Sequence, residues 1–498
     1  MSTRPSTTQV EGFHVAAPPK RTTLPEPKWN DLEPLPGGGD GSPIFISNNP
    51  EIFTGTGLLA GTTQPAGASS RSTTAPISGL TNFGYYLFHI NRTGGTKRVF
   101  LLASTVGDWP VSASVSGALN ANAWGPGASA SVYTGKAMVT RYPISRTIEI
   151  LPGKPAALGY IDVYNGHCVD GRFAIRATGG LRVWDVAAPA GASTSEAATL
   201  ARTRFAPGEI KSPNAATGAM GRCAGLYRHD RWNGKLEVEI DSTPFVRGFR
   251  FDERGQAFEG LATYKDSDPK SSGNYGSLYD LELTLTNTLA REAVITVEFA
   301  SYPAQFAPAD LKEYWAFLSK RRWSIPSRLW DGHAAVAHRG KNRLVQVFTK
   351  PTSPNAMRAS LLSATLAAGA TETARLRIPV PGLISIPAAI IIRATAANAG
   401  ALAVREKWTA TTVSVAAAPT PTSDATLGAV QGEDAGDLTQ EPSAKEETPT
   451  TASANGPSPA PEAPPGVTPP PPIPRSKFNP EESWTIAFLR ERRRQRDT

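Results

Sequence analysis

The strict alternation of apolar and polar residues between positions 278 and 287 constrains the fold most. The apolar set Tyr279, Leu281, Leu283 and Leu285 is interleaved with acidic and threonine side chains. A period of two places one face on a core and the other in water, as in an antiparallel strand. The same alternation returns at Ile295, Val297 and Phe299, so we predict that the two segments pair as a hairpin.

Short apolar runs of this kind, separated by Gly, Pro, Asn and Asp, recur along most of the chain. Their near-regular spacing is typical of a β-sandwich or barrel. With 45 glycines, 44 prolines and little helical periodicity, the sequence excludes helical bundles and coiled coils. The predicted strands are 44–46, 85–90, 99–102, 138–141, 147–150, 158–163, 173–176, 181–186, 236–240, 245–251, 344–349, 374–378 and 390–393, with helices near 195–204 and 309–318.

The 498 residues are too many for one core. We predict a mainly β protein with two antiparallel β domains, the second an immunoglobulin-like sandwich that contains the 278–299 hairpin. The predicted division is a disordered arm (1–35), a first β domain (36–190), a connector (191–232), a second β-sandwich domain (233–410), an acidic Pro-rich disordered linker (411–475) and a basic amphipathic docking helix (476–498).

The C-terminal region has its own character. Residues 411–475 hold eight acidic and two basic side chains and end in a proline run, a composition that stays disordered. After it, Asn479, Pro480 and two glutamates supply helix-start signals. The predicted helix places Trp484, Ala487 and Phe488 on one face and ends in a basic group that includes Arg490, Arg493 and Arg494. We expect these six residues to dock on a protein partner or an anionic membrane surface, and a frayed terminus without function is the alternative.

The net charge is +8. Subtracting −6 for the linker, +2 for the terminal helix and zero for the arm leaves about +12 on residues 36–410. An excess of this size favours adhesion to an anionic glycan, peptidoglycan or lipid surface over specific nucleic-acid binding.

Motifs for common chemistry are missing from the sequence. The six histidines form no H-E-x-x-H pattern, and neither G-x-S-x-G nor a phosphate-binding loop occurs. His229 and Asp230 lie in the densest polar-aromatic cluster, residues 227–232, but sequence neighbours on a strand or turn point apart. The Asp266–Asp268 loop has oxygen ligands for calcium, although an ordinary loop is the simpler interpretation, and Asn91 begins a glycosylation pattern. We therefore predict no enzyme, no catalytic or metal residues and no cofactor.

Cys168 and Cys223 form no C-x-x-C, which excludes a structural zinc site. They either form a disulfide in an oxidising compartment or remain two buried thiols. No run approaches the roughly 20 apolar residues of a membrane span. The first 35 residues contain no apolar signal-peptide core, so we expect no export by the general secretory route.

Two stretches resemble a cyanobacterial family known as domain of unknown function 3370. The first is Pro34-Leu35-Pro36-Gly37, Asp40 and Pro43-Ile44-Phe45-Ile46-Ser47-Asn48-Asn49-Pro50-Glu51, similar to the family's PLPG and PVFNSN-x-PE text. The second is Gly273-Asn274-Tyr275-Gly276 with the alternating strand that follows. The resemblance spans roughly residues 34–395 and implies a β-rich, exported protein of the cell envelope or periplasm, while the missing signal peptide would place the chain in the cytoplasm. It transfers no catalytic residue.

We therefore expect a non-enzymatic structural or binding protein: a basic β-sandwich body that associates with the cell envelope or a large assembly, tethered to a partner by the C-terminal helix. Two alternatives remain. One is a carbohydrate-active hydrolase with carboxylates at strand ends. The other is a subunit of a large photosynthetic or capsid-like assembly.

Overall fold

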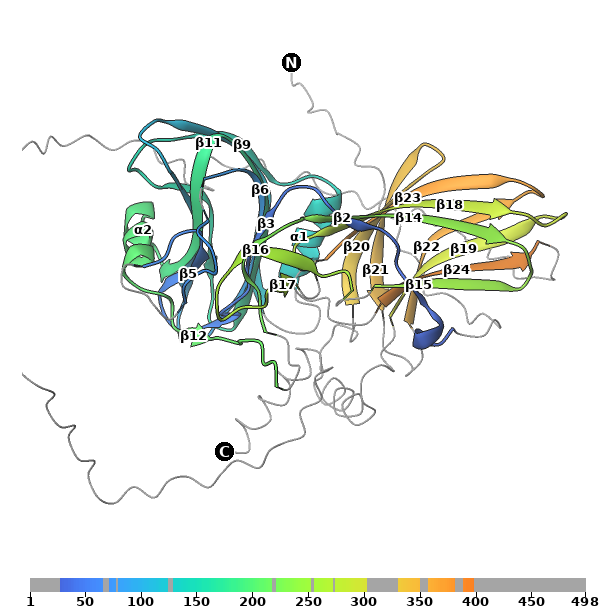
Figure 1. The fold of residues 1–498 in the computed structure, drawn as a ribbon, viewed down its shortest axis with the longest axis horizontal. Coiled ribbons are helices and arrows are strands. Elements are labelled where there is room, and N and C mark those ends of the chain that lie inside the picture. Colours follow the sequence, from blue (N-terminus) through green and yellow to red (C-terminus); the bar gives the residue numbers. More distant parts are fainter. Residues whose placement is uncertain are drawn as a thin grey trace, which may run out of the picture. The chain divides into compact units, whose positions relative to one another are not determined.

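The computed structural model describes residues 27–65, 71–77, 79–123, 129–216, 221–251, 255–271, 274–301, 330–349, 357–380 and 388–397. These residues are mainly β, arranged in three sheets (Figure 1). The helices among them are α1 (Ser129–Val139), α2 (Thr194–Thr203) and the short 3-10 helix η1 (Trp29–Asp31). The mainly β class predicted from the sequence is confirmed.

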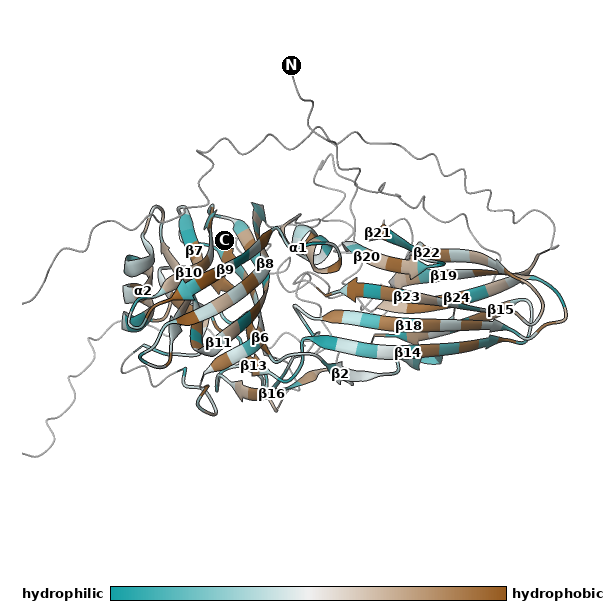
Figure 2. Cartoon of the chain, turned by 90° about the horizontal axis from the view of Figure 1, so that it is seen from above, coloured by the Kyte–Doolittle hydropathy of each residue, from teal (hydrophilic) through white to brown (hydrophobic). Residues whose placement is uncertain are grey.

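Two smaller sheets pack against each other around one hydrophobic core. The five-stranded sheet has the order β1 (Glu33–Pro34), β15 (Phe245–Arg250), β24 (Ala388–Ala396), β19 (Ala293–Ser301) and β22 (Met357–Leu366). The six-stranded sheet has the order β2 (Gly38–Asp40), β14 (Arg231–Ile240), β18 (Leu278–Asn287), β23 (Thr371–Pro379), β20 (Trp330–His338) and β21 (Lys341–Thr349). Hydrophobic and hydrophilic bands follow one another along these strands (Figure 2), and Leu283 of β18 and Val297 of β19 share the buried cluster.

The predicted hairpin of β18 and β19 is wrong. β18 pairs with β14 and β23 in the six-stranded sheet, whereas β19 pairs with β22 and β24 in the five-stranded sheet. The segment between them therefore crosses from one layer to the other. Alternation correctly identified the buried face of each strand. It does not show pairing, because two strands in opposite layers have the same alternating pattern as two strands paired in one sheet.

The thirteen-stranded sheet is organised by its longest strand, β11 (His167–Pro189). The first half of β11 pairs with β6 (Leu80–Asn91) and β8 (Val111–Ala123), and the second half with β7 (Lys97–Thr105) and β5 (Gly57–Gly61). The register shifts between Arg176 and Leu181, where Gly179 and Gly180 allow the strand to change neighbours. The other strands are β3 (Ile44–Ser47), β4 (Ile52–Phe53), β9 (Ile144–Ile150), β10 (Ala156–Val163), β12 (Gly208–Glu209), β13 (Ala224–Tyr227), β16 (Phe258–Thr263) and β17 (Lys270–Ser271).

Most predicted elements are present. α2 is confirmed, with Ser193 as its N-cap and Glu196 completing a capping box. The predicted strand at 138–141 is wrong because Met138 and Val139 end helix α1. The predicted strands 173–176 and 181–186 are parts of the single strand β11. The sequence interpretation missed β8, and the helix predicted at 309–318 lies outside the described residues.

The structure does not follow a simple sequential division of the chain. β13, which falls in the predicted connector, pairs with β3 and β16 inside the thirteen-stranded sheet. β1 and β2 precede that sheet in sequence but belong to the two smaller sheets. One buried cluster contains Tyr86 and Tyr227 of the thirteen-stranded sheet together with Leu281 and Ile390 of the smaller sheets, so the described sheets share a core.

Candidate functional site

The segment Ser47–Glu51 at the end of β3 takes part in several buried polar contacts. All five residues have low exposure. Ser47 points to a carboxylate in the core, Asn49 bridges two loops, Pro50 offers its carbonyl to a histidine, and Glu51 pairs with an arginine. This segment connects the interior of the thirteen-stranded sheet to the loops at its edge.

Asp185 of β11 is the centre of the interior network. Its carboxylate accepts hydrogen bonds from Ser47 Oγ (2.9 and 3.0 Å), Tyr85 OH (2.9 Å) and the Ala60 amide (3.1 Å), and His89 Nε2 lies 2.8 Å from Oδ2. All four side chains are fully buried. Burial, reinforced by the Asp185 charge, raises the pKa of Tyr85 well above its usual range, so its hydroxyl remains a donor.

Ser47, His89 and Asp185 have the residue types of a catalytic triad but not its geometry. In a triad, the base contacts the nucleophile through one ring nitrogen and the carboxylate through the other. Here Ser47 Oγ (2.9 Å) and Asp185 Oδ2 (2.8 Å) both lie at His89 Nε2, while Nδ1 donates to the Pro50 carbonyl (2.7 Å). Because Ser47 Oγ also donates to Asp185, the three buried groups form one hydrogen-bonded cluster that connects β3, β6 and β11.

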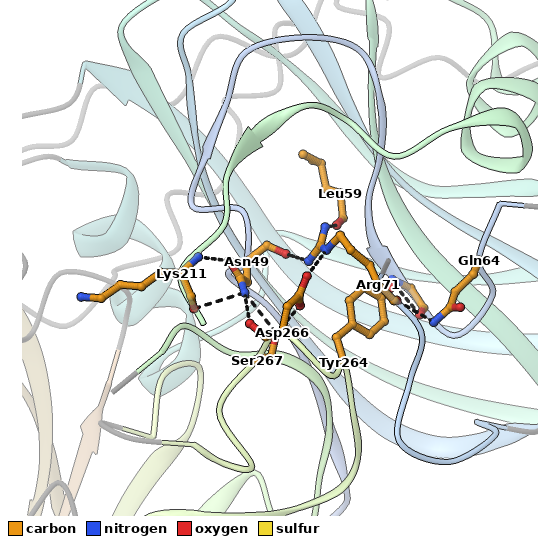
Figure 3. Close-up of polar contacts among 9 residues, drawn as sticks. Asn49, Leu59, Gln64, Arg71, Lys211, Tyr264, Asp266 and Ser267 are labelled. Carbon is orange, nitrogen blue, oxygen red and sulfur yellow. Dashed lines mark hydrogen bonds and ion pairs between the residues drawn. The ribbon is translucent and has the colours of Figure 1, made fainter. Parts of the chain in front are cut away.

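A second cluster surrounds Arg71, in the loop between β5 and β6 (Figure 3). Its Nε donates to Asp266 Oδ2 (2.7 Å), Nη1 donates to the Leu59 carbonyl (3.3 Å) and Nη2 to the Asn49 carbonyl. The guanidinium carbon lies 5.0 Å from the ring centres of both Phe205 and Tyr264. Arg71 is therefore held on every side and fixes the loop to the sheet.

Asn49 extends the Arg71 cluster to the residues after β12. Its Nδ2 donates to the Asp266 carbonyl (2.9 Å) and to Ser267 Oγ (3.2 Å), and its Oδ1 accepts from the Lys211 amide (3.1 Å). Figure 3 shows the Lys211 side chain directed away from Asn49. Asn49 Nδ2 also donates to the Lys211 carbonyl (3.5 Å), so both contacts between Asn49 and Lys211 use the Lys211 backbone, and its ammonium group lies among other neighbours.

Lys211 belongs to a charged group with Glu51, Glu209, Arg222 and Asp268. Arg222 Nε lies 2.9 Å from Glu51 Oε2, and its Nη2 lies 3.5 Å from Glu209 Oε1. Burial, with the Arg222 charge as a second cause, lowers the pKa of Lys211 to about 8. Burial raises the pKa of Asp268, against the opposing effects of the Gly221 amide and Lys211.

Arg172 of β11 joins the thirteen-stranded sheet to the smaller sheets. Its Nε donates to the Gly276 carbonyl (2.7 Å), and its Nη2 lies 2.6 Å from Asp230 Oδ2. Nearby, Asn274 has a positive φ of 48° and its amide binds the Gln256 carbonyl (2.7 Å) and Tyr279 OH (3.0 Å). Two of the sequence motifs noted above, Ser47–Glu51 and Asn274–Gly276, therefore lie at buried contacts that connect different parts of this fold.

The structure shows the surroundings of two sequence motifs, the His229/Asp230 pair and the Asn91 glycosylation pattern. Asp230 bonds to Arg172 and the Ser42 amide (3.1 Å), and His229 packs edge-on against Phe258, so no contact between Asp230 and His229 is found. Asn91 is fully buried, with Nδ2 donating to Val163 and Gly95 carbonyls, so in this fold its amide is not accessible to a glycosyltransferase.

The remaining predicted site residues have different outcomes. Cys168 and Cys223 are both buried thiols, not a disulfide. Burial raises the pKa of Cys168 far above its usual range. The six predicted docking residues, Trp484, Ala487, Phe488, Arg490, Arg493 and Arg494, lie outside the described residues.

The described part of the chain contains no group of three or more His, Cys, Asp or Glu side chains placed to bind a metal ion. Asp266 is a candidate calcium ligand from the sequence, but one of its carboxylate oxygens is paired with Arg71. Within the same residues, no helix has the length and apolar character needed to cross a membrane.

The fold defines a mainly β protein of packed sheets, and comparisons with known proteins add no narrower class. No family model matches the chain, and no curated protein sequence is significantly similar to it. Solved structures match weakly. Tripeptidyl peptidase 2 shares 11% identity at a TM-score of 0.17, over 70% of this chain and 24% of that chain. Lac15 from a marine microbial metagenome shares 12% at 0.11, over 70% and 62%. The T=1 Penaeus vannamei nodavirus structure shares 9% at 0.13, over 68% and 89%. At these scores none of them shows a common fold.

Proposed function

We propose that this chain is a non-enzymatic binding protein whose basic β-sandwich body associates with an anionic surface of the cell envelope, with a C-terminal docking helix on a flexible linker as its tether. In this proposal the two smaller sheets form an immunoglobulin-like sandwich. The resemblance to the domain-of-unknown-function family supports the envelope location.

The proposal is carried by the contrast between buried polar side chains and exposed aromatic side chains. Ser47, His89 and Asp185, the residue types used in nucleophilic and acid–base chemistry, have no exposed surface and bond to one another. In contrast, Trp109 (63% exposed) and Tyr164 (60% exposed) stand on turns at the ends of strands. Exposed aromatic rings on a positively charged body are features of binding surfaces.

The positive charge of the β body indicates an anionic partner. Residues 36–410 carry about +12. Several cations in the described part are committed to carboxylates, such as Arg375 to Asp280 (2.6 Å) and Arg98 to Asp162 (2.8 Å). The excess positive charge beyond such pairs attracts anionic polymers or lipids, and salt weakens that attraction.

Co-sedimentation tests the proposal. The full chain and a chain truncated after Ala410 are each mixed with insoluble anionic envelope polymer, with phosphatidylserine vesicles and with uncharged cellulose. We expect both chains to sediment with an anionic material, to remain in solution with cellulose and to be released as salt is raised. Failure of both chains to bind any anionic material would refute the proposal.

The tether has a separate test. The double substitution Trp484→Ala with Phe488→Ala should abolish capture of a tether partner by the full chain, while the melting temperature of the β body stays unchanged. A matched change in the linker, Glu446→Ala with Glu447→Ala, should leave capture intact. Retention of the partner by the Trp484/Phe488 variant would show that this face is not the docking surface.

A further inference from the structure

The turn that connects β7 to β8, residues 106–110, carries an exposed tryptophan. β7 and β8 pair with different halves of β11, so the turn lies next to Gly179 and Gly180, where β11 changes neighbours. Trp109 is 63% exposed, the largest value among the large hydrophobic side chains of the described residues. Single exposed apolar residues are common on protein surfaces, so the way this ring is held decides whether it can bind a ligand.

Trp109 lies flat on Gly107 of the same turn. Three consecutive atoms of its six-membered ring, Cζ2, Cη2 and Cζ3, are all 2.7–2.8 Å from the position that a Cβ on Gly107 would take. Nearly equal distances to three neighbouring ring atoms mean that this position faces the plane of the ring, because an approach to the edge would be much closer to one atom than to the others. One face of the indole therefore rests on the glycine, and the exposure comes from the other face and the rim.

Hydrogen bonds hold the turn under the ring. Thr105 Oγ1 donates to the Gly107 carbonyl (2.8 Å), and the Val106 amide donates to the Gly180 carbonyl (3.0 Å). A ligand that binds to a ring on such a support orders little new structure.

The rim of the ring carries a hydrogen-bond donor. Trp109 Nε1 lies 3.4 Å from the position that a Cβ on Gly179 would take. Among the described residues, no acceptor for this N–H group is found. Trp109 therefore offers an open apolar face together with a donor at its edge, and a matching ligand presents a flat apolar surface beside a free carbonyl.

A polyproline II segment presents this combination. Its pyrrolidine rings are apolar, and its carbonyls are free to accept because the helix has no internal hydrogen bonds. Four consecutive prolines occur once in the sequence, at Pro469–Pro472, followed by Ile473 and Pro474. This proline run lies outside the described residues. The chain therefore carries its own candidate ligand for the ring.

Reach and charge both favour a contact within one chain. Residues 398–468, 71 in number, separate the last described residue from the proline run. A flexible segment of that length typically spans roughly 45 Å, and such tethers give effective concentrations on the order of millimolar. The segment 411–475 carries −6 and residues 36–410 about +12, so the run is attracted to the body. A contact too weak to form between separate molecules can therefore form within one.

We propose that the proline run 469–474 of this chain docks on Trp109, with pyrrolidine rings stacked on the open face of the indole and a backbone carbonyl accepting a hydrogen bond from Nε1. The docked run holds the segment that precedes the C-terminal helix against the turn between β7 and β8. This goes beyond the proposed function, which requires only a flexible linker, and it is independent of what the basic body binds.

Disulfide trapping in the full chain tests the docking. Asp108→Cys places a thiol next to Trp109 in the sequence, and Ser476→Cys places a second one just after the proline run. Oxidised glutathione is the oxidant, and non-reducing electrophoresis follows disulfide formation in dilute protein. The two native cysteines are buried and do not compete.

The control pair is Tyr164→Cys with Ser476→Cys. Tyr164 is 60% exposed and follows Val163, which pairs with Lys97 at the start of β7, whereas Trp109 follows the end of β7. We expect the Asp108/Ser476 pair to form its disulfide about tenfold faster than the control pair, because stacking on one indole face raises the local population of the run by about that factor.

Further substitutions in the Asp108/Ser476 background test the geometry. Trp109→Ala, or alanine at all four positions 469–472, should slow the disulfide about tenfold. Trp109→Phe keeps a ring face but loses the donor and should slow it about threefold to fivefold. Gly107→Ala keeps the tryptophan but pushes a methyl group into the face of its ring, and should also slow the reaction. The matched control Gly95→Ala, whose Cβ would meet only Lys97 Nζ at 3.8 Å, should change nothing.

Each contrary outcome overturns the docking. Equal rates for the two cysteine pairs, or an unchanged rate in Trp109→Ala, would show that the run does not dock on this ring. A disulfide that joins two chains, faster at higher protein concentration, would mean that the ring contacts a second copy. None of these results affects co-sedimentation of the body with anionic material, so the proposed function stands or falls separately. Melting temperatures equal to that of the wild type show that the variants are folded.

Discussion

Replacing Asp185 with asparagine is the sharpest test of how the thirteen-stranded sheet is held together. Asparagine keeps the shape and one oxygen, so Ser47, Tyr85 and the Ala60 amide retain an acceptor at the Oδ1 position. The charge is lost, and an amide NH₂ group takes the place of Oδ2, which lies beside Ser47 Oγ and His89 Nε2.

The expected magnitude follows from the burial of every participant. A hydrogen bond to a charged group contributes about 1.5–3 kcal/mol, and leaving a buried donor or acceptor without a partner costs about 1–3 kcal/mol. Asp185 and its side-chain partners have no exposed surface, so solvent cannot replace what is lost. We therefore expect Asp185→Asn to destabilise the body by about 4 kcal/mol, equivalent to a fall in melting temperature of roughly 5 °C for a folded unit of this size.

Differential scanning calorimetry of the full chain measures this, with Asp162→Asn as the matched control. Asp162 makes a bidentate pair with Arg98 but its side chain is 43% exposed, so its loss should cost less than about 1 kcal/mol. Adding Ser47→Ala to Asp185→Asn should cost less than the sum of the two single changes, because both act on one network. A melting temperature for Asp185→Asn equal to that of Asp162→Asn would refute the interpretation that this carboxylate holds the sheets.

Three further outcomes are expected. Gly276→Ala should be strongly destabilising because Gly276 has a φ of 78° and a Cβ there would lie 2.4 Å from Tyr86. The control Gly340→Ala, at a φ of 71° with open space around it, should cost only about 1 kcal/mol. Equal urea midpoints for the two variants would contradict this expectation. Lys211→Met should raise stability relative to the wild type at pH 7, and the gain should vanish by pH 10.5. The pKa of Lys211 is lowered from 10.5 to about 8 in the folded protein, so the wild type loses stability as pH falls from 10.5 to about 8, and the loss is complete below that; a pH-independent difference in urea midpoint would be the contrary result. Both buried cysteine thiols should resist alkylation in the folded protein and react in guanidinium, and rapid labelling of the native chain would contradict their burial.

Strand positions were predictable where large apolar residues mark a buried face. α1 shows the limit of that signal. Its buried positions are mostly small residues such as Ala130, Ser131, Thr134 and Ala137, which produce no apolar periodicity, so the apolar pair Met138 and Val139 at its end suggested a strand instead. In β8, Val111, Ala113 and Val115 do alternate with serines, and the signal was present but weak because alanine adds little hydrophobicity.

Sheet membership could not be predicted from these patterns. Leu283 and Val297 are both buried members of alternating strands, yet one lies in the six-stranded sheet and the other in the five-stranded sheet. The physical information that separates the two cases is the path of the connection, residues 288–292, and a short polar segment is compatible with either a turn or a crossing.

The buried polar centre was equally invisible, because its members are far apart in sequence. Ser47, His89 and Asp185 are separated by 42 and 96 positions along the chain, and each lies within or at the end of an otherwise apolar strand. A polar residue in such a run signals that a buried partner must exist, since burial without hydrogen bonds is costly. It does not say which residue that partner is.

The residues of the two sequence motifs lie at contacts within and between the sheets. Ser47 and Glu51 supply the side chains that bind Asp185 and Arg222, and the Gly276 carbonyl accepts the hydrogen bond from Arg172 that joins the sheets. These contacts need particular residue types because the groups are buried and each has one geometry that satisfies it. Substitutions at these buried residues are therefore expected to disturb the fold, whereas substitutions at exposed residues such as Tyr164 are not. Residues on the exposed turns can vary with the ligand because the fold does not depend on them.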